Sequence, residues 1–179
     1  MAHPDDEFLF GFPVIHRAKK IIACVDDKTH PTRTWCRRRD EAFKEICAMV
    51  GAEAQVLRFD SGFRGLEHEK MKDFVGQVFH AVKDAETLFT HNAWGEYGHW
   101  DHIILHGIAR QAGKPVLTTD ISLHADWYHV QPVTQGLKVD HCRNDMRFHE
   151  QCMEIYHSKG AMGWTMPPVQ ECNLIEVLR

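Results

Sequence analysis

Two clusters of metal-ligating side chains stand far apart in this chain. In the first, His3-Pro4-Asp5-Asp6-Glu7, Asp6 stands three positions after His3, so one turn at a strand end can direct both at a single point. His102, in the second cluster, would supply a third ligand. Two imidazoles and a carboxylate with an open coordination position suit a catalytic divalent cation, most often zinc. The pattern predicts a site for metal-dependent hydrolysis.

Asp5 and the loop before His102 supply groups for proton transfer. Asp5, between two predicted ligands, is left over as a base beside metal-bound water, whose pKa falls from about 15.7 towards 7. Tyr97 and His99 lie in the loop that delivers His102, and such donors would support negative charge on an attacked amide oxygen. Asp101 would hydrogen-bond the His99 ring and raise its pKa, so that His99 protonates the departing amine.

These residues also have explanations that involve no chemistry. The His-Pro-Asp-Asp segment would suit a turn whose Asp side chains cap a helix starting near Glu7, and Asp101 would suit an N-cap of the helix that follows it. Tyr97 would suit packing. His106, four residues after His102 on the same helix face, would suit a supporting contact better than a metal ligand. The coincidence of both clusters in one short chain favours the chemical interpretation.

Composition narrows the class of protein. The chain has 179 residues, 44% of them hydrophobic, and a net charge of −4, which fits one globular domain over 1–179 and argues against a nucleic-acid partner. The run Arg37-Arg38-Arg39 indicates a solvated helix start. Apolar runs are too short to span a bilayer, and no basic stretch with an apolar h-region opens the sequence. Six cysteines without a C-x-x-C pair favour reduced thiols and a cytoplasmic location.

Short apolar runs alternate with helical patterns, which is typical of an α/β fold with a mainly parallel sheet flanked by helices. Strands are expected at 20–25, 54–59, 87–90 and 114–118, and helices at 38–50, 67–84, 101–112 and 144–157. Residues 121–139 have a mixed, extended and turning pattern. Four polar clusters, at 3–6, 26–27, 60–62 and 91–102, stand where strands should end. In open α/β sheets ligands bind at the carboxyl ends of strands, so these clusters predict one shared pocket.

The motifs resemble those of the PIG-L/LmbE-like family of zinc-dependent de-N-acetylases. Residues 2–7 match its signature A-H-P-D-D-E, and residues 95–102 are similar to its second motif, G-x-Y-G-H-x-D-H. The resemblance is clear from His3 to about Ala109. It implies a Rossmann-like fold and hydrolysis of an N-acyl group, usually acetyl, from an amino sugar or sugar conjugate.

The resemblance also implies roles, position by position. His3, Asp6 and His102 would bind zinc, with Fe²⁺ as an alternative metal, and Asp5 would be the general base. His99 would be the acid or electrostatic partner, tuned by Asp101, and Tyr97 would be an oxyanion donor.

Two departures from the family pattern affect the scaffold. The family's first strand precedes the signature, whereas here only Met1 and Ala2 do, so we expect that strand to be short or missing, and a homo-oligomer is one way to supply it. Pro13 prevents a long regular helix after the signature. In addition, Trp100 replaces a common proline in the second motif.

Other interpretations remain open. A non-catalytic glycan- or metal-binding protein would use the same scaffold, and a non-haem iron oxygenase would use the same ligand types, usually on an all-β fold. The sequence does not identify the N-acylated substrate. Candidate substrate contacts, each equally suited to surface or packing roles, are Arg38, Asp60, Arg64, Trp94 and Trp100.

Overall fold

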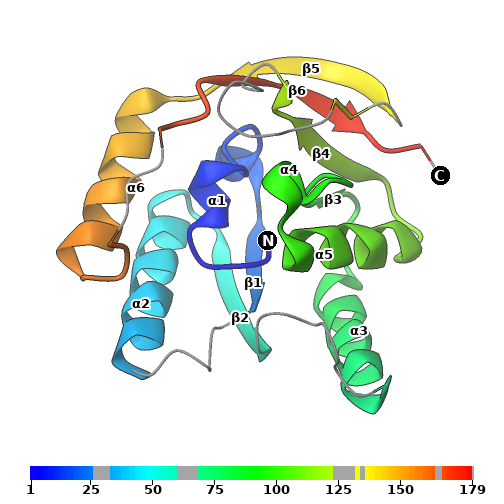
Figure 1. Cartoon of the computed structure of the whole chain (residues 1–179), viewed down its shortest axis with the longest axis horizontal. Coiled ribbons are helices and arrows are strands. Elements are labelled where there is room, and N and C mark those ends of the chain that lie inside the picture. The colour runs from blue at the N-terminus through cyan, green and yellow to red at the C-terminus, as the bar shows by residue number, and fades with distance from the viewer. Residues whose placement is uncertain (26–32, 60–67, 123–131, 134–135, 164–166, 179) are drawn as a thin grey trace. The chain divides into compact units, whose positions relative to one another are not determined.

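The computed structural model describes residues 1–25, 33–59, 68–122, 132–133, 136–163 and 167–178 (Figure 1). Contacts divide the chain into two compact units. The first unit comprises residues 1–61 and 143–170, and the second comprises residues 62–142 and 171–179. Within the described segments, no helix has the length and apolar character needed to cross a membrane. The predictions at 26–27, at 60–62 and at Arg64 lie outside the described residues.

The first unit is a parallel strand pair with helices packed beside it. Its elements in chain order are α1 (Asp6–Leu9), a 3-10 turn (Ile15–Arg17), β1 (Lys20–Val25), α2 (Arg33–Met49), β2 (Glu53–Phe59) and α6 (Met146–Ser158). β1 and β2 pair in parallel from Lys20↔Glu53 onward. Helix α2 packs on β2 and α6 packs on α2. The buried face of α2 is apolar at helical spacing, as predicted, and its fully buried residues are Ala42, Phe43, Ile46 and Cys47.

The first two residues lie alongside β1 and are joined to it by backbone hydrogen bonds. The Met1 ammonium donates to the Ile22 carbonyl at 2.8 Å. The Ala2 carbonyl accepts from the amides of Cys24 and Val25 at 3.1 and 2.8 Å. Met1 and Ala2 therefore make the contacts of a very short parallel strand, and the signature that begins at His3 starts beside the carboxyl end of β1.

The second unit contains a four-stranded sheet in the order β3-β4-β6-β5. Its elements are α3 (His68–Val82), β3 (Leu88–Phe89), α4 (Gly95–Gly98), α5 (Trp100–Gln111), β4 (Val116–Asp120), β5 (Leu137–Arg143) and β6 (Glu171–Glu176). Strands β3 and β4 are parallel, whereas β6 runs antiparallel to β4. Leu88, Ala109, Val116 and Val177 form a buried cluster that joins α5 to the sheet. This packing anchors the C-terminal end of α5, and the second motif lies at the opposite end of the same helix.

The predicted α/β class, with parallel strands flanked by helices, is confirmed. The antiparallel strand β6 was not predicted, because its pairing with β4 joins segments more than fifty residues apart and leaves no local sequence signal. Strand β4 begins at Val116 rather than at residue 114. Strand β5 arises at the end of the segment expected to be mixed. The two units leave the prediction of a single domain untested.

Candidate active site

In the first unit, His3 and Asp6 lie on one tight turn. The backbone amide of His3 donates to Asp6 Oδ2 at 2.7 Å, and His3 Nδ1 is 3.4 Å from the same oxygen. Two ligands of a tetrahedral zinc, with bonds of about 2.0–2.1 Å, stand about 3.3 Å apart. The separation of this imidazole nitrogen from this carboxylate therefore fits two ligands of one ion.

Asp5, between them, is held in an unusual backbone conformation. Its φ is 106° and its ψ is −30°, in a region that side chains other than glycine rarely adopt. The Asp5 amide donates to Glu7 Oε2 at 2.7 Å. Asp5 occupies the position before α1 but makes no side-chain capping bond, so the helix-cap explanation of this residue is wrong. Strain of this kind is typical of functional residues held by their surroundings.

The Asp5 carboxylate is paired with a buried guanidinium. Arg39 Nη2 lies 2.6 Å from Asp5 Oδ2, with only 11% and 7% of the two side chains exposed. The same nitrogen also donates to the Pro4 carbonyl. Burial raises the pKa of Asp5 to about 6, against the opposing effect of the Arg39 charge. A carboxyl in this range exchanges protons near neutral pH, which suits a general base.

Arg39 corrects the sequence-based view of the arginine run. The run was expected to be solvated, yet Arg39 is largely buried, and its guanidinium lies 4.6 Å from the centre of the Trp35 ring. Helix α2 begins at Arg33, well before the run. Arg39 follows buried Cys36 by three residues and precedes buried Phe43 by four, which places it on the apolar face of α2. This spacing is the signal that would have identified it.

Glu7 ties the signature to α6. Tyr156 donates its hydroxyl to Glu7 Oε1 at 2.9 Å, and the other oxygen of Glu7 accepts the Asp5 amide. Burial and the nearby Asp5 charge raise the pKa of Glu7 to about 8. The Phe8 ring lies 5.6 Å from the Tyr156 ring. The signature loop is thus fixed from two sides, by α2 through Arg39 and by α6 through Tyr156.

In the second unit, the loop after β3 brings two histidines onto one carboxylate. Glu96 Oε2 lies 2.9 Å from His91 Nδ1 and 2.6 Å from His102 Nδ1, and all three side chains are fully buried. The His91 and His102 rings are stacked, with centroids 3.6 Å apart. The sequence placed His91 and Glu96 in the polar cluster at 91–102 but assigned neither a role, because Glu96 occupies the variable position of the second motif and His91 precedes that motif.

Asn92 locks Glu96 in place. The Asn92 amide donates to Glu96 Oε1 and the Glu96 amide donates to Asn92 Oδ1, each at 3.0 Å. The Asn92 side chain also donates to the Thr119 carbonyl at 3.2 Å. These bonds hold Glu96 at a φ of 57°, which is rare outside glycine. Burial by itself would raise the pKa of Glu96, but the electrostatic interaction with His91 and the hydrogen bonds from His102 and His91 outweigh it and lower that pKa to about 2.

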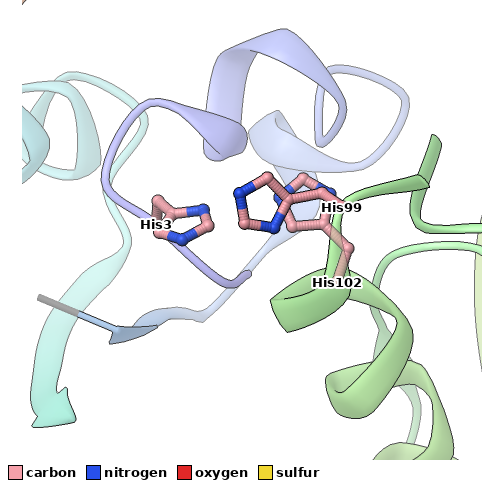
Figure 2. Close-up of side chains that lie close together, drawn as sticks. All are labelled: His3, His99 and His102. Carbon is pink, nitrogen blue, oxygen red and sulfur yellow. The ribbon is translucent and has the colours of Figure 1, made fainter. Parts of the chain in front are cut away.

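His99 and Tyr97 flank His102 in the same unit. The His99 and His102 rings stack with centroids 4.5 Å apart, and Figure 2 shows them side by side at the start of α5, with His3 on the loop before α1. The Tyr97 ring lies 5.9 Å from the His99 ring and 5.8 Å from the His102 ring. Tyr97 is 41% exposed, so its hydroxyl lies on a side chain that solvent reaches.

Asp101 and His99 are joined through the backbone. The Asp101 amide donates to His99 Nδ1 at 3.3 Å, which makes His99 the N-cap of α5. The expectation that Asp101 itself caps this helix is therefore wrong. Asp101 is fully buried. Because His99 Nδ1 accepts this bond, the proton of the neutral ring belongs on Nε2, the atom available to donate to a substrate.

The remaining predicted residues have simpler surroundings. His106 Nδ1 bonds the His91 carbonyl at 2.8 Å, in agreement with a supporting contact. Trp94 and Trp100 are 49% and 42% exposed, and Trp94 Nε1 donates to the Pro132 carbonyl at 3.3 Å. Arg38 is exposed on α2. A contact of any of these with substrate stays a prediction.

The sequence model of the PIG-L family, GlcNAc-PI de-N-acetylase, matches residues 1–113, which include both motifs. The chain belongs to the PIG-L family. The matched segment covers the whole region in which the resemblance was expected. No curated protein sequence matches the chain significantly.

Solved structures similar to this PIG-L chain share its fold at low identity. A deacetylase–teicoplanin complex from teicoplanin biosynthesis aligns over 99% of this chain and 96% of the other, with 12% identity and a TM-score of 0.67. N,N'-diacetylchitobiose deacetylase from Pyrococcus horikoshii aligns over 88% and 67%, with 12% identity and a TM-score of 0.61. The 4-carboxy-2-hydroxymuconate hydratase from Pseudomonas putida KT2440 aligns over 99% and 94%, with 13% identity and a TM-score of 0.60. Since these include a hydratase, the fold alone does not decide the reaction.

Proposed function

We propose that this protein is a metal-dependent N-deacetylase that releases acetate from an N-acetylated amino sugar or a sugar conjugate. The observation that carries the proposal is the PIG-L family match over residues 1–113, which contains both motifs intact. Deacetylases of N,N'-diacetylchitobiose and from the teicoplanin pathway share the fold. We also propose that residues 1–179 act as one catalytic domain. None of the six cysteines forms a disulfide, which suits a reducing, cytoplasmic location.

The proposed metal ligands are His3, Asp6 and His102, with zinc as the first candidate and Fe²⁺ as an alternative. His3 Nδ1 and Asp6 Oδ2 have the separation of two ligands of one ion, and the His102 ring bonds Glu96 through Nδ1, which leaves Nε2 as its ligand atom. When bound, the cation would lower the pKa of water and polarise the acyl carbonyl. The donor set, two imidazoles and one carboxylate, fits a catalytic zinc site.

Asp5 is the proposed general base. Its buried carboxylate has a pKa raised to about 6, close to the pH at which an acid–base group is most effective. Its pairing with Arg39 holds one oxygen in a fixed place. Asp5 accepts the proton of the attacking water, and the strained backbone keeps the carboxylate from turning away.

His99 and Tyr97 are the proposed groups that act on the substrate's carbonyl and leaving nitrogen. With Nδ1 bonded to the Asp101 amide, His99 presents Nε2 as its donor. The Tyr97 hydroxyl supports the developing oxyanion, and the His99 Nε2–H group donates a hydrogen bond to the departing nitrogen. Asp101 holds His99 in this arrangement through its backbone amide. To protonate the departing nitrogen, His99 must be in its imidazolium form, in which Nδ1 carries a proton and gives up the bond from the Asp101 amide.

The decisive experiment measures acetate release from a panel of N-acetylated amino sugars and an N-acetylated disaccharide, with metal-free and zinc-reconstituted protein in parallel. Zinc-dependent acetate release is the expected result. Stoichiometric zinc without turnover of any substrate would favour a glycan- or metal-binding protein instead. Turnover that the metal-free protein retains in full would contradict metal dependence. Reconstitution with Fe²⁺, with and without oxygen, separates a hydrolase from an oxygenase.

A further inference from the structure

One buried carboxylate serves two imidazoles in the loop between β3 and α5. Glu96 Oε2 accepts from His91 Nδ1 at 2.9 Å and from His102 Nδ1 at 2.6 Å, and Glu96 Oε1 accepts the Asn92 amide at 3.0 Å. Glu96, His91 and His102 have side chains with 0% exposure. Three donors thus surround one carboxylate that water does not reach.

This arrangement determines which ring nitrogen carries the proton. A carboxylate surrounded by three donors acts as an acceptor only, so each Nδ1 that contacts Glu96 Oε2 must carry hydrogen. In a neutral imidazole with a protonated Nδ1, Nε2 has the free lone pair and is the atom that binds a cation. The same carboxylate therefore sets both His91 and His102 to the Nδ1–H tautomer, which in His102 makes Nε2 the atom that can bind a metal.

The backbone around Glu96 leaves it little freedom to reorient. Asn92 bonds both Glu96 Oε1 and the Glu96 amide, and Glu96 has a φ of 57°. Gly95, which precedes it, has a φ of 62°, and a Cβ there would lie 2.9 Å from Ile103 Cγ1. The segment is built for this one placement of the carboxylate, at the cost of two residues in the left-handed region.

We propose that Glu96 is a positioning residue that holds His102 and His91 as Nδ1–H tautomers and so presents the buried Nε2 atom of His102 to a divalent cation. The role of His102 as a ligand rests on the proposed function, whereas the tautomers do not depend on it. Carboxylates that orient ligand histidines in this way typically contribute a factor of about 10–100 to metal affinity.

The first test needs no substitution and no activity. In metal-free wild-type protein labelled with ¹⁵N at histidine, long-range ¹H–¹⁵N spectra report the tautomer of each ring. We expect His91 and His102 to be protonated at Nδ1, with one strongly downfield Nδ1 proton from the short 2.6 Å bond of His102. Signals that show His102 protonated at Nε2 alone would overturn the proposal.

The second test measures zinc affinity by chelator competition in Glu96→Gln, with Glu69→Gln as the control. Glu69 is a 79% exposed residue of α3, so its substitution makes the same chemical change at the surface. Because both rings bond the same carboxylate oxygen, the Gln amide can accept from both only by turning its NH2 group towards the Asn92 amide, which is itself a donor, and the opposite orientation turns the NH2 group towards both Nδ1 atoms. We expect zinc affinity to fall about 10–100-fold in Glu96→Gln and to stay unchanged in Glu69→Gln. The histidine spectrum of Glu96→Gln should show a changed tautomer.

The outcomes separate this proposal from the proposed function. Equal zinc affinity and unchanged tautomers in a folded Glu96→Gln protein would refute the role of Glu96. Wild-type protein that binds no zinc would instead refute the metal assignment, while the wild-type tautomers still decide the role of Glu96. If Glu96→Gln does not fold, the wild-type spectrum alone decides it.

Discussion

Replacing Arg39 with methionine should destabilise the protein strongly, because it leaves the Asp5 carboxylate buried without its counter-charge. Arg39 Nη2 lies 2.6 Å from Asp5 Oδ2, and the two side chains are 11% and 7% exposed. Removing one partner of a buried ion pair costs about 3–5 kcal/mol. For a chain of this size, Tm falls by about 2–4 °C for each kcal/mol, so Arg39→Met should lower Tm by about 6–20 °C.

The chain offers a matched control on the same helix. Arg37 pairs with Glu41 at 3.7 Å, but these side chains are 72% and 55% exposed. Exposed pairs contribute at most about 1 kcal/mol, so Arg37→Met should change Tm by no more than about 4 °C. Thermal unfolding followed by circular dichroism compares both variants with the wild type. Equal, small Tm shifts for Arg39→Met and Arg37→Met would refute the reasoning.

Two further measurements identify the buried charge as the cause. Adding Asp5→Asn to Arg39→Met removes that charge, so the double variant should be more stable than Arg39→Met alone. The folded pKa of Asp5, about 6, lies above its unfolded value of 3.8, so ionisation of Asp5 lowers stability as pH rises through this range. Because Arg39 lowers that pKa, its loss should raise it further. The penalty of Arg39→Met should therefore be smaller at pH 5 than at pH 8.

Three other predictions concern the proposed site and its scaffold. Zinc analysis of purified variants should show that His102→Ala loses the metal and that His106→Ala retains it, because His106 Nδ1 bonds a backbone carbonyl. The reverse result would mean that His106, and not His102, is the ligand. Asp5→Asn should keep zinc and lose about 10²–10⁴-fold in deacetylation rate, and full activity would exclude the base role. Gly95→Ala should lower the free energy of unfolding by about 1–3 kcal/mol, because Gly95 has a φ of 62° and a Cβ there would meet Ile103. Gly107→Ala is the control: a Cβ there has no neighbouring atom within 4 Å, so Tm should stay unchanged or rise slightly. Equal Tm values for the two variants would contradict this account.

Local patterns were enough to predict most helices and strands, but they did not predict which strands pair with one another. The apolar run at 20–25 became β1, and the helical spacing of Phe43, Ile46 and Cys47 became the buried face of α2. Strand β6 was missed because its partner β4 is distant in sequence. The two residues before the signature contact β1 through backbone groups alone, which no side-chain pattern encodes.

The supporting residues of the candidate site were missed for a related reason. Motif spacing identifies groups that would touch the metal or the substrate, and His3, Asp6 and His102 carry such spacing. Arg39 was hidden in a run of charges, although its position relative to Cys36 and Phe43 places it on a buried face. Glu96 has no such signal, because its role follows from a positive φ and from an exchange of hydrogen bonds with Asn92 that only the folded loop creates.

Each unit nevertheless contains a buried charged residue that pairs with a motif residue of the same unit. In the first unit the Arg39 cation fixes the Asp5 carboxylate, and in the second the Glu96 carboxylate fixes the His102 imidazole. Both partners act on the protein without metal, so the orientation of the proposed base and of the proposed ligand is established during folding rather than at binding. Ordering costs that would oppose metal binding within either unit are thereby reduced. Sequence motifs of this family should accordingly be judged together with the buried charges that orient them.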